Sequence, residues 1–222
     1  PETTNTTWLK RIGVIGTRAE KVNKIYPISD GGIVAIGSKD DNAWIVKLDR
    51  DGNIQREKII AHAIGYDIVQ KANGGFALVA TSKSLVSGNN PTLFIELDKN
   101  LALISSKSFI PPSGFKLDTY PGHDKLLIKT NDGGYLIRDF PIYTNCFYCG
   151  GSAWIIKLNH QGTVQWSKFY DDGGILDQLY IYKIIETADG GYLAVGTSEF
   201  NGVNNWIGKL DSVGNIQWER TF

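Results

Sequence analysis

The stretch DGGYLAVG at residues 189–196 and the stretch WIGKLDSVGNIQW at residues 206–218 decide the fold of this chain. Both contain apolar runs of the length of a β-strand, and each run is bounded by residues rich in Gly and Asp. Apolar runs of this length are typical of antiparallel β-strands. The glycines between them accept the positive φ that tight hairpins need. No segment shows a sustained helical period. The sequence therefore predicts an all-β fold.

Both stretches recur along the chain. Asp-Gly-Gly, or Asn-Gly-Gly in one copy, starts at residues 30, 73, 132 and 189. The phrase Trp-Ile-x-Lys-Leu-Asp starts at residues 44 and 206, and the copy at residue 154 ends in Asn159 instead of Asp. Leu-Phe-Ile-Glu-Leu-Asp at residue 93 is a divergent copy. An aliphatic residue stands five positions ahead of every Gly-rich turn: Ile25, Ile68, Leu127 and Ile184. The chain is therefore a four-fold repeat.

Each unit reads as four strands, A to D, with a Gly-rich A–B turn, a variable B–C loop and an Asp-x-x-Gly C–D turn. A four-stranded unit of about 40–60 residues is typical of a propeller blade, because one unit alone cannot bury both of its faces. We expect one β-propeller domain over residues 1–222, built of four four-stranded antiparallel blades. Their approximate bounds are 20–62, 63–110, 122–171 and 178–222.

An additional strand is expected at residues 7–13, where Trp8 and Lys10 align with Trp166 and Lys168. Two alternatives follow: a four-bladed propeller with one surplus edge strand, or a segment cut from a longer propeller. The recurrent tryptophans are expected to be buried between blades: Trp154, Trp166, Trp206 and Trp218. In the Asp-x-x-Gly turns, the Asp side chain is expected to accept hydrogen bonds from the turn backbone.

The phrases DGGY and WIxKLDxxGNIQW resemble those of a family of bacterial and archaeal exported repeat proteins that form β-propellers. The later phrases are also similar to the Trp-docking repeat of quinoprotein-type propellers and to the Asp-box turn of sialidases. The resemblance spans residues 8–222 and implies a propeller that is extracellular or on the cell surface. It implies no activity, because the matching residues hold blades together and a fold does not fix a function.

Composition excludes several classes of partner. The chain has 23 basic and 23 acidic residues, whereas a nucleic-acid binder normally carries a basic excess. No apolar run approaches the roughly 20 residues that span a bilayer, so we expect no membrane insertion. Cys146 and Cys149 fall two short of a closed zinc site, and no cofactor motif occurs, so neither metal nor cofactor is expected. If the protein is exported, these cysteines are expected to form a disulfide within their loop.

The variable loops indicate where a ligand would bind. The Gly-rich turns all lie at one end of the blades, and the long B–C and D–A connections all lie at the other. Variable loops on a regular scaffold commonly carry binding residues. We expect a site for a protein or a glycan at this second end, centred on the third unit. Its aromatic and imidazole candidates are Phe115, Tyr120, His123, Tyr143, Phe147 and Tyr148.

Arg138 and Asp139 form a second feature of the third unit. The other units carry Ile36-Gly37, Val79-Ala80 and Val195-Gly196 at these positions. Charges in a normally apolar strand are costly unless paired, so these residues are candidates for the site. The alternative, which the sequence favours, is an edge strand on which they face solvent or pair with a neighbouring blade.

Three function classes remain open. A non-catalytic binding or interaction module fits best, because every repeated residue has a structural explanation. A lectin would use the aromatic loop residues, although lectin sites on propellers usually recur once per blade. A hydrolase would need a carboxylate cluster. Asp139, Asp171, Asp172 and Glu199 share one face, but nothing in the sequence links them.

Overall fold

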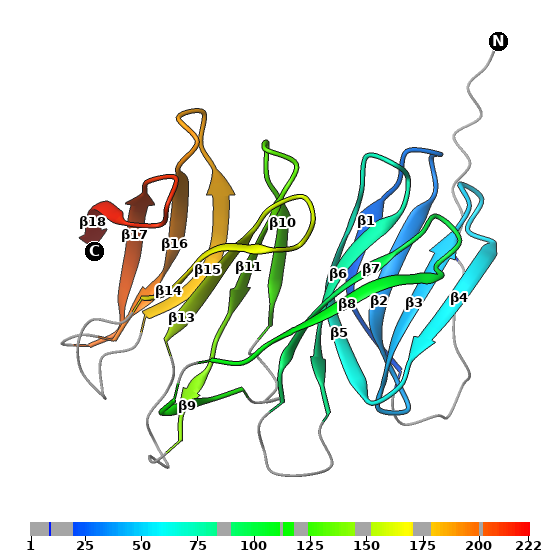
Figure 1. Cartoon of the computed structure of the whole chain (residues 1–222), viewed down its shortest axis with the longest axis horizontal. Helices are drawn as coiled ribbons and strands as arrows, with labels where there is room; N and C mark the ends of the chain where they lie inside the picture. The colour runs from blue at the N-terminus through cyan, green and yellow to red at the C-terminus, as the bar shows by residue number, and fades with distance from the viewer. Residues whose placement is uncertain are drawn as a thin grey trace. The chain divides into compact units, whose positions relative to one another are not determined.

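The computed structural model describes residue 9 and residues 20–83, 90–111, 113–117, 124–144, 152–170, 179–199 and 202–222. Within these ranges every regular element is a β-strand (Figure 1). The expected strand 7–13 falls outside them. The chain divides into two compact units, residues 1–83 with 93–106 and residues 84–92 with 107–222. The two units are described separately.

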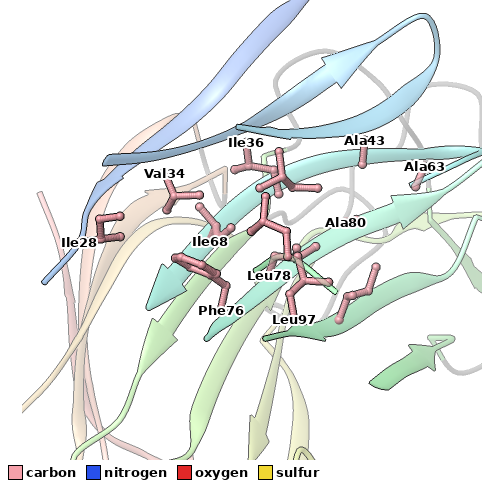
Figure 2. Close-up of a cluster of buried hydrophobic side chains, with 13 residues drawn as sticks. Ile28, Val34, Ile36, Ala43, Ala63, Ile68, Phe76, Leu78, Ala80 and Leu97 are labelled. Atoms are coloured by element: carbon pink, nitrogen blue, oxygen red, sulfur yellow. The ribbon is translucent and has the colours of Figure 1, made fainter. Parts of the chain in front are cut away.

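The first unit carries two antiparallel sheets, each an A–B–C–D meander as predicted. The first sheet consists of β1 (Lys21–Pro27), β2 (Ile33–Lys39), β3 (Asn42–Leu48) and β4 (Ile54–Ile60). The second consists of β5 (Ala63–Gln70), β6 (Phe76–Ser82), β7 (Thr92–Leu97) and β8 (Leu103–Phe109). Buried aliphatic side chains and Phe76 pack between them, and Figure 2 shows this cluster. Burial of such side chains contributes about 1.5–3 kcal/mol each.

The second unit carries two further four-stranded sheets and one small one. The third sheet consists of β10 (Leu126–Lys129), β11 (Tyr135–Asp139), β13 (Ala153–Leu158) and β14 (Val164–Tyr170). The fourth consists of β15 (Leu179–Glu186), β16 (Tyr192–Ser198), β17 (Asn204–Leu210) and β18 (Ile216–Thr221). β9 (Phe115–Lys116) pairs with β12 (Ile142–Tyr143). The four meanders span residues 21–60, 63–109, 126–170 and 179–221.

The Gly-rich turns explain why the A–B hairpins form. The first glycine of each turn has a φ between 77° and 84°, a conformation that side chains disfavour. The second glycine faces strand C so closely that a Cβ there would lie 2.2–2.5 Å from a leucine carbonyl oxygen. The preceding Asp or Asn accepts a hydrogen bond from its amide at 2.9–3.1 Å. The two glycines therefore have different functions.

The C–D turns follow the predicted hydrogen-bond pattern. In each turn, the first residue's Oδ1 accepts hydrogen bonds from the amides two and four residues later, at 2.7–3.0 Å. The fourth residue is left-handed in all copies, including Leu101 with φ 65°. Leu101 is buried in the core of the first unit, and that burial offsets the conformational cost.

An ion pair connects each Gly-rich turn with strand C. Lys157 contacts Asp132 at 2.7 Å, and the first and fourth sheets repeat the pair at 2.9 and 2.8 Å. In the second sheet the charges are exchanged. Glu96 replaces the strand-C lysine, Asn73 replaces the aspartate, and Lys71 pairs with Glu96 at 2.5 Å. The repeat therefore retains a charge pair at this place even where both residue types have changed.

The tryptophans do not all occupy the predicted environment. Trp154 and Trp206 on strand C are buried, and their Nε1 atoms donate to Ser167 Oγ and Glu219 Oε2. Trp166 on β14 is half-buried and donates to Ser212 O in the C–D turn of the fourth sheet. Trp218 was expected to be buried but is 45% exposed. Its strand β18 is the outer strand of the fourth sheet, and no described turn packs on it as the Ser212 turn packs on Trp166.

This difference predicts two unequal substitutions. Trp206→Ala should lower the free energy of unfolding by about 3–5 kcal/mol, because it empties a buried site and removes a hydrogen bond. Trp218→Ala should change it by less than about 1 kcal/mol, because nearly half of this residue is already exposed to solvent. Urea denaturation followed by circular dichroism measures both. Equal losses in the two variants would contradict the assigned environments.

Candidate functional site

A cleft of about 220 Å³ opens in the second unit, where the third sheet meets β15 of the fourth. It lies where strands A begin and strands B end, which is the end that carries the B–C and D–A connections. Charged and aromatic side chains alternate around it. The lining residues are Asp124, Leu126, Arg138, Phe140, Tyr180, Ile181 and Tyr182.

Position 139 explains why the third sheet is open here. In the first and fourth sheets the equivalent residue is glycine, and a Cβ on it would lie 1.7–1.8 Å from a strand-A carbonyl oxygen. In these two sheets strand A can approach because no side chain intervenes, and in the second sheet it still pairs with the small residue Ala80. The third sheet has Asp139 instead, and its strand A, β10, is only 4 residues long against 7 for β1 and 8 for β15. Pairing with β11 ends at Leu126 opposite Arg138.

Asp139 lies in a buried polar cluster. Lys125, just ahead of β10, forms an ion pair with its carboxylate, and Thr92 donates a hydrogen bond from Oγ1. Lys125 Nζ also donates to Thr92 Oγ1 at 3.1 Å, and the amide of Phe140 donates to Asp139 Oδ1 at 2.7 Å. The side chains of Lys125 and Asp139 are 1% and 3% exposed. Buried charges of this kind are tolerated only when they are paired and hydrogen-bonded.

The pKa values of the two partners reflect competing effects. Burial alone would raise the pKa of Asp139, but the charge of Lys125 and the hydrogen bonds from Lys125, Thr92 and Phe140 hold it below its ordinary value. Burial lowers the pKa of Lys125, and Asp139 opposes that effect. The Asp139 carboxylate is therefore ionised at neutral pH, and its oxygens accept the hydrogen bonds of these three residues.

Arg138 lines the cleft directly. Its Nη1 donates a hydrogen bond to the backbone oxygen of Asp124, and the residue is 7% exposed. The favoured interpretation was an edge strand on which the two residues face solvent or pair with a neighbouring blade. The edge strand and the solvent exposure are wrong, because β11 lies between β10 and β13 and both Arg138 and Asp139 are buried. Asp139 pairs with Lys125 beside β10, so the charge is balanced at the end of its own sheet.

Aromatic side chains form the other wall. Phe140 and Tyr180 stack with ring centroids 4.3 Å apart and an interplanar angle of 17°. Burial, with smaller contributions from Glu199 and Tyr182, raises the pKa of Tyr180 to about 12. Its hydroxyl therefore stays neutral under physiological conditions. Tyr182 is exposed, and its hydroxyl shares a hydrogen bond of 2.7 Å with Thr197 Oγ1.

Phe115 lies elsewhere. Its ring stacks on Phe169 at 4.8 Å, and Phe169 stacks on Trp154 at 5.5 Å. Phe115 thus packs against the third sheet and does not line the cleft. The side chain of Tyr143 lies outside the described part of the structure, as do Tyr120, His123, Phe147, Tyr148 and the expected disulfide partners Cys146 and Cys149.

Of the predicted site residues, only Arg138 lines the cleft, and Asp139 lies directly behind it. Sequence reasoning missed Asp124, Phe140, Tyr180 and Tyr182. Phe140 lies two residues after the unusual Arg138 and could have been found by extending that segment, whereas Asp124 lies 14 residues ahead of Arg138 and could not. Tyr180 and Tyr182 could not, because they belong to another unit of the repeat.

In the ranges that the structure covers, no group of three or more His, Cys, Asp or Glu side chains could hold a metal ion. None of the described segments forms a helix that is long and apolar enough to span a bilayer. For the carboxylates considered as a hydrolase cluster, Asp139 is paired with Lys125, and Asp171 and Asp172 lie outside the described residues.

Comparison with solved structures places the chain among β-propellers. The Dos1 propeller superposes with a TM-score of 0.53 at 10% identity, over 90% of this chain and 47% of that one. A tail fibre of Staphylococcus aureus phage P68 gives a TM-score of 0.40 at 13% identity, over 95% and 40% of the two chains. No protein-family model and no curated protein matches the chain.

The likeness to the Dos1 propeller shows the fold alone, because the identity is 10%. Together with the four four-stranded antiparallel sheets, it confirms the predicted β-propeller class. The chain spans about half of the length of that structure.

The buried pair predicts a specific stability pattern. Asp139→Ala should lower the free energy of unfolding by about 3–5 kcal/mol, because Lys125 is left buried without its counter-charge. The double variant Lys125→Met/Asp139→Ala should recover most of that loss, because no charge remains buried. Chemical denaturation at pH 7 measures both. A double variant as unstable as the single one would show that the pair is not the cause.

Proposed function

We propose that this protein is a non-catalytic β-propeller binding module that receives a side chain of a protein partner in the cleft beside Arg138. The observation that supports this is the departure of the third sheet from its own repeat. Buried charges replace the apolar residues and glycines of the other sheets at positions 138 and 139, and the cleft opens at that place. Departures from a repeat that carry a structural cost are expected at functional sites.

The chemistry of the cleft suits recognition more than catalysis. Arg138 supplies a guanidinium positioned by the Asp124 carbonyl, and the Phe140–Tyr180 stack supplies a rigid apolar wall. Asp139 has a structural function, because its carboxylate forms an ion pair with Lys125 and accepts a hydrogen bond from Thr92. A volume of about 220 Å³ is smaller than a typical drug-sized pocket, so the cleft accommodates one side chain or one terminal group.

A protein partner is favoured over a glycan because the charged residues beside the cleft are specific to the third repeat unit. Repeated scaffolds that bind glycans usually present one site per repeat, whereas Arg138 and Asp139 have no charged counterparts in the other three units. Guanidinium groups pair best with carboxylates, with two parallel hydrogen bonds. We therefore expect the partner to contribute an acidic side chain or a carboxyl terminus. The resemblance to exported repeat proteins supports binding outside the cell or at its surface.

A lectin is the second candidate. The observation that favours it is the presence of hydroxyl groups on Tyr180 and Tyr182 beside the polar groups of Asp124 and Arg138. Sugars are recognised by such combinations of aromatic rings and hydrogen-bonding groups. A glycan array distinguishes the two candidates.

The test begins with selection of peptides from a displayed random library on the wild-type protein. The selected peptides are then titrated against Arg138→Val, which places in the third sheet the residue of the fourth sheet at position 195. Binding should weaken about 10- to 100-fold, because a charge-assisted hydrogen bond is lost. Arg56→Val, which removes an exposed arginine of β4, is the matched control and should bind like the wild type.

Selected peptides that bind Arg138→Val as tightly as the wild type would contradict the placement of the site. Failure to select any peptide, together with saturable binding on the glycan array that depends on Arg138, would replace the first candidate with the lectin.

A further inference from the structure

A second cleft, of about 380 Å³, lies in the same unit at the opposite ends of the strands. It is formed by the Gly-rich turn, β13 and β14 of the third sheet together with β15, β16 and the Gly-rich and C–D turns of the fourth. Sequence reasoning assigned no ligand to this end, because the turns there are nearly identical from sheet to sheet. The lining residues that carry its chemistry are Asp132, Lys157, Trp166, Glu186 and Tyr192.

The charged groups leave the cleft with an excess of one negative charge. Lys157 is fully engaged, since its Nζ donates to Asp132 Oδ2 at 2.7 Å, to Gln165 Oε1 at 2.9 Å and to Leu158 O at 3.0 Å. Glu186 is the second carboxylate. Its Oε2 accepts a hydrogen bond from the amide of Asn131 at 2.7 Å, which fixes its position at the rim.

The hydroxyl group of Tyr192 is a second indication that this cleft holds a ligand, independent of the charges. It is 2% exposed, and it lines the cleft. Its hydroxyl has no hydrogen-bond partner among the described residues, and it is not one of the side-chain atoms sealed from solvent. A buried hydroxyl without a partner costs free energy unless water or a ligand satisfies it. The hydroxyl is not needed for packing, because Phe76 occupies the equivalent position of the second sheet and is fully buried.

Trp166 supplies an aromatic wall with a fixed orientation. Its Nε1 donates to Ser212 O at 3.0 Å, and its ring meets Tyr192 edge-on at a centroid distance of 6.0 Å. The indole ring is the best of the aromatic partners for a cation that lies against its face. An aromatic wall, a carboxylate and a free hydroxyl together form the usual environment for a bound organic cation.

We propose that this cleft binds an organic cation, a primary ammonium or guanidinium group that contacts Glu186, Tyr192 and Trp166. The ammonium or guanidinium donates to the Glu186 carboxylate and to the Tyr192 hydroxyl oxygen, while its alkyl chain lies against Trp166. The site is distinct from the cleft at Arg138 and does not depend on the function proposed for that cleft.

The electrostatics of the cleft are consistent with this ligand. Burial, followed by the negative charges of Glu186 and Asp132, raises the pKa of Tyr192, so the hydroxyl remains neutral. Although burial opposes it, hydrogen bonds from Lys157, Thr130 and Gly134 lower the pKa of Asp132 to about 2. Asp132 therefore stays ionised and keeps Lys157 engaged over the physiological range, leaving the charge of Glu186 for the ligand.

The test is an NMR titration of isotope-labelled protein. The probes are N-acetyl-lysine methylamide, N-acetyl-arginine methylamide and butylamine, with N-acetyl-norleucine methylamide as the neutral isostere. The reporter is the Trp166 indole N–H resonance, identified with a Trp166→Phe variant. The cations should shift it saturably and the isostere should not. Binding of butylamine as tight as that of the amino-acid derivatives would indicate free amines as ligands, whereas tighter binding of the derivatives would indicate side chains of a protein.

Tyr192→Phe and Glu186→Gln should each weaken cation binding by about tenfold, the loss expected for one hydrogen bond to a charged group. The matched controls are Tyr135→Phe, at the same repeat position in the third sheet, and Glu57→Gln on β4, and both should bind like the wild type. Circular dichroism verifies that each variant is folded. Equal shifts from the isostere, unchanged affinity in both cleft variants, or no saturable shift from any cation would overturn the proposal.

Discussion

The close approach of the second turn glycine to strand C is the constraint on which each sheet depends. A Cβ at Gly32, Gly75, Gly134 or Gly191 would lie 2.2–2.5 Å from a leucine carbonyl oxygen, so no other residue fits without displacing the backbone. This contact brings the A–B hairpin against strand C, and it places the turn aspartate within reach of the strand-C lysine. The exchange of charges between Lys71 and Glu96 in the second sheet shows that the pair can be inverted while the glycine contact is kept.

The candidate site arises where a related constraint is broken. Gly37 and Gly196 admit the carbonyl of strand A, whereas Asp139 stands at the equivalent position of the third sheet. The carboxylate needs Lys125 and Thr92 as partners, and β10 is short where these groups are accommodated. One substitution within the repeat is thereby connected to a buried ion pair, a shortened strand and an open cleft. The aromatic residues Tyr180 and Tyr182 belong to β15, which is long enough for both of them to line this cleft.

Much of this fold could be predicted from sequence because the determining interactions are local. The Gly-rich and Asp-x-x-Gly turns set the strand boundaries within a few residues, and each of the four predicted units corresponds to one meander. The Asp-x-x-Gly hydrogen bonds also form as expected, since donor and acceptor lie two and four residues apart. The unusual character of Arg138 and Asp139 was visible in the same alignment of the chain with itself.

The remaining features depend on contacts between distant residues. Asp139 accepts a hydrogen bond from Thr92, 47 residues earlier, and nothing in the local sequence indicates that contact. Trp166 and Trp218 occupy the same repeat position, yet a C–D turn packs only on Trp166 in the described structure, so their exposures differ. Tyr192 reads as an ordinary core aromatic, because Phe76 fills the same position in the second sheet.

The structure of a variant that restores the repeat tests most directly whether residue 139 opens the cleft. Asp124→Ile/Lys125→Tyr/Arg138→Val/Asp139→Gly gives the third sheet the residues of the fourth at Ile181, Tyr182, Val195 and Gly196, where Ile181 pairs with Gly196. We predict that a crystal structure of this variant shows β10 beginning ahead of Leu126, with residue 124 paired to residue 139 and the cleft closed. A strand that still begins at Leu126 beside an open cleft would contradict the account.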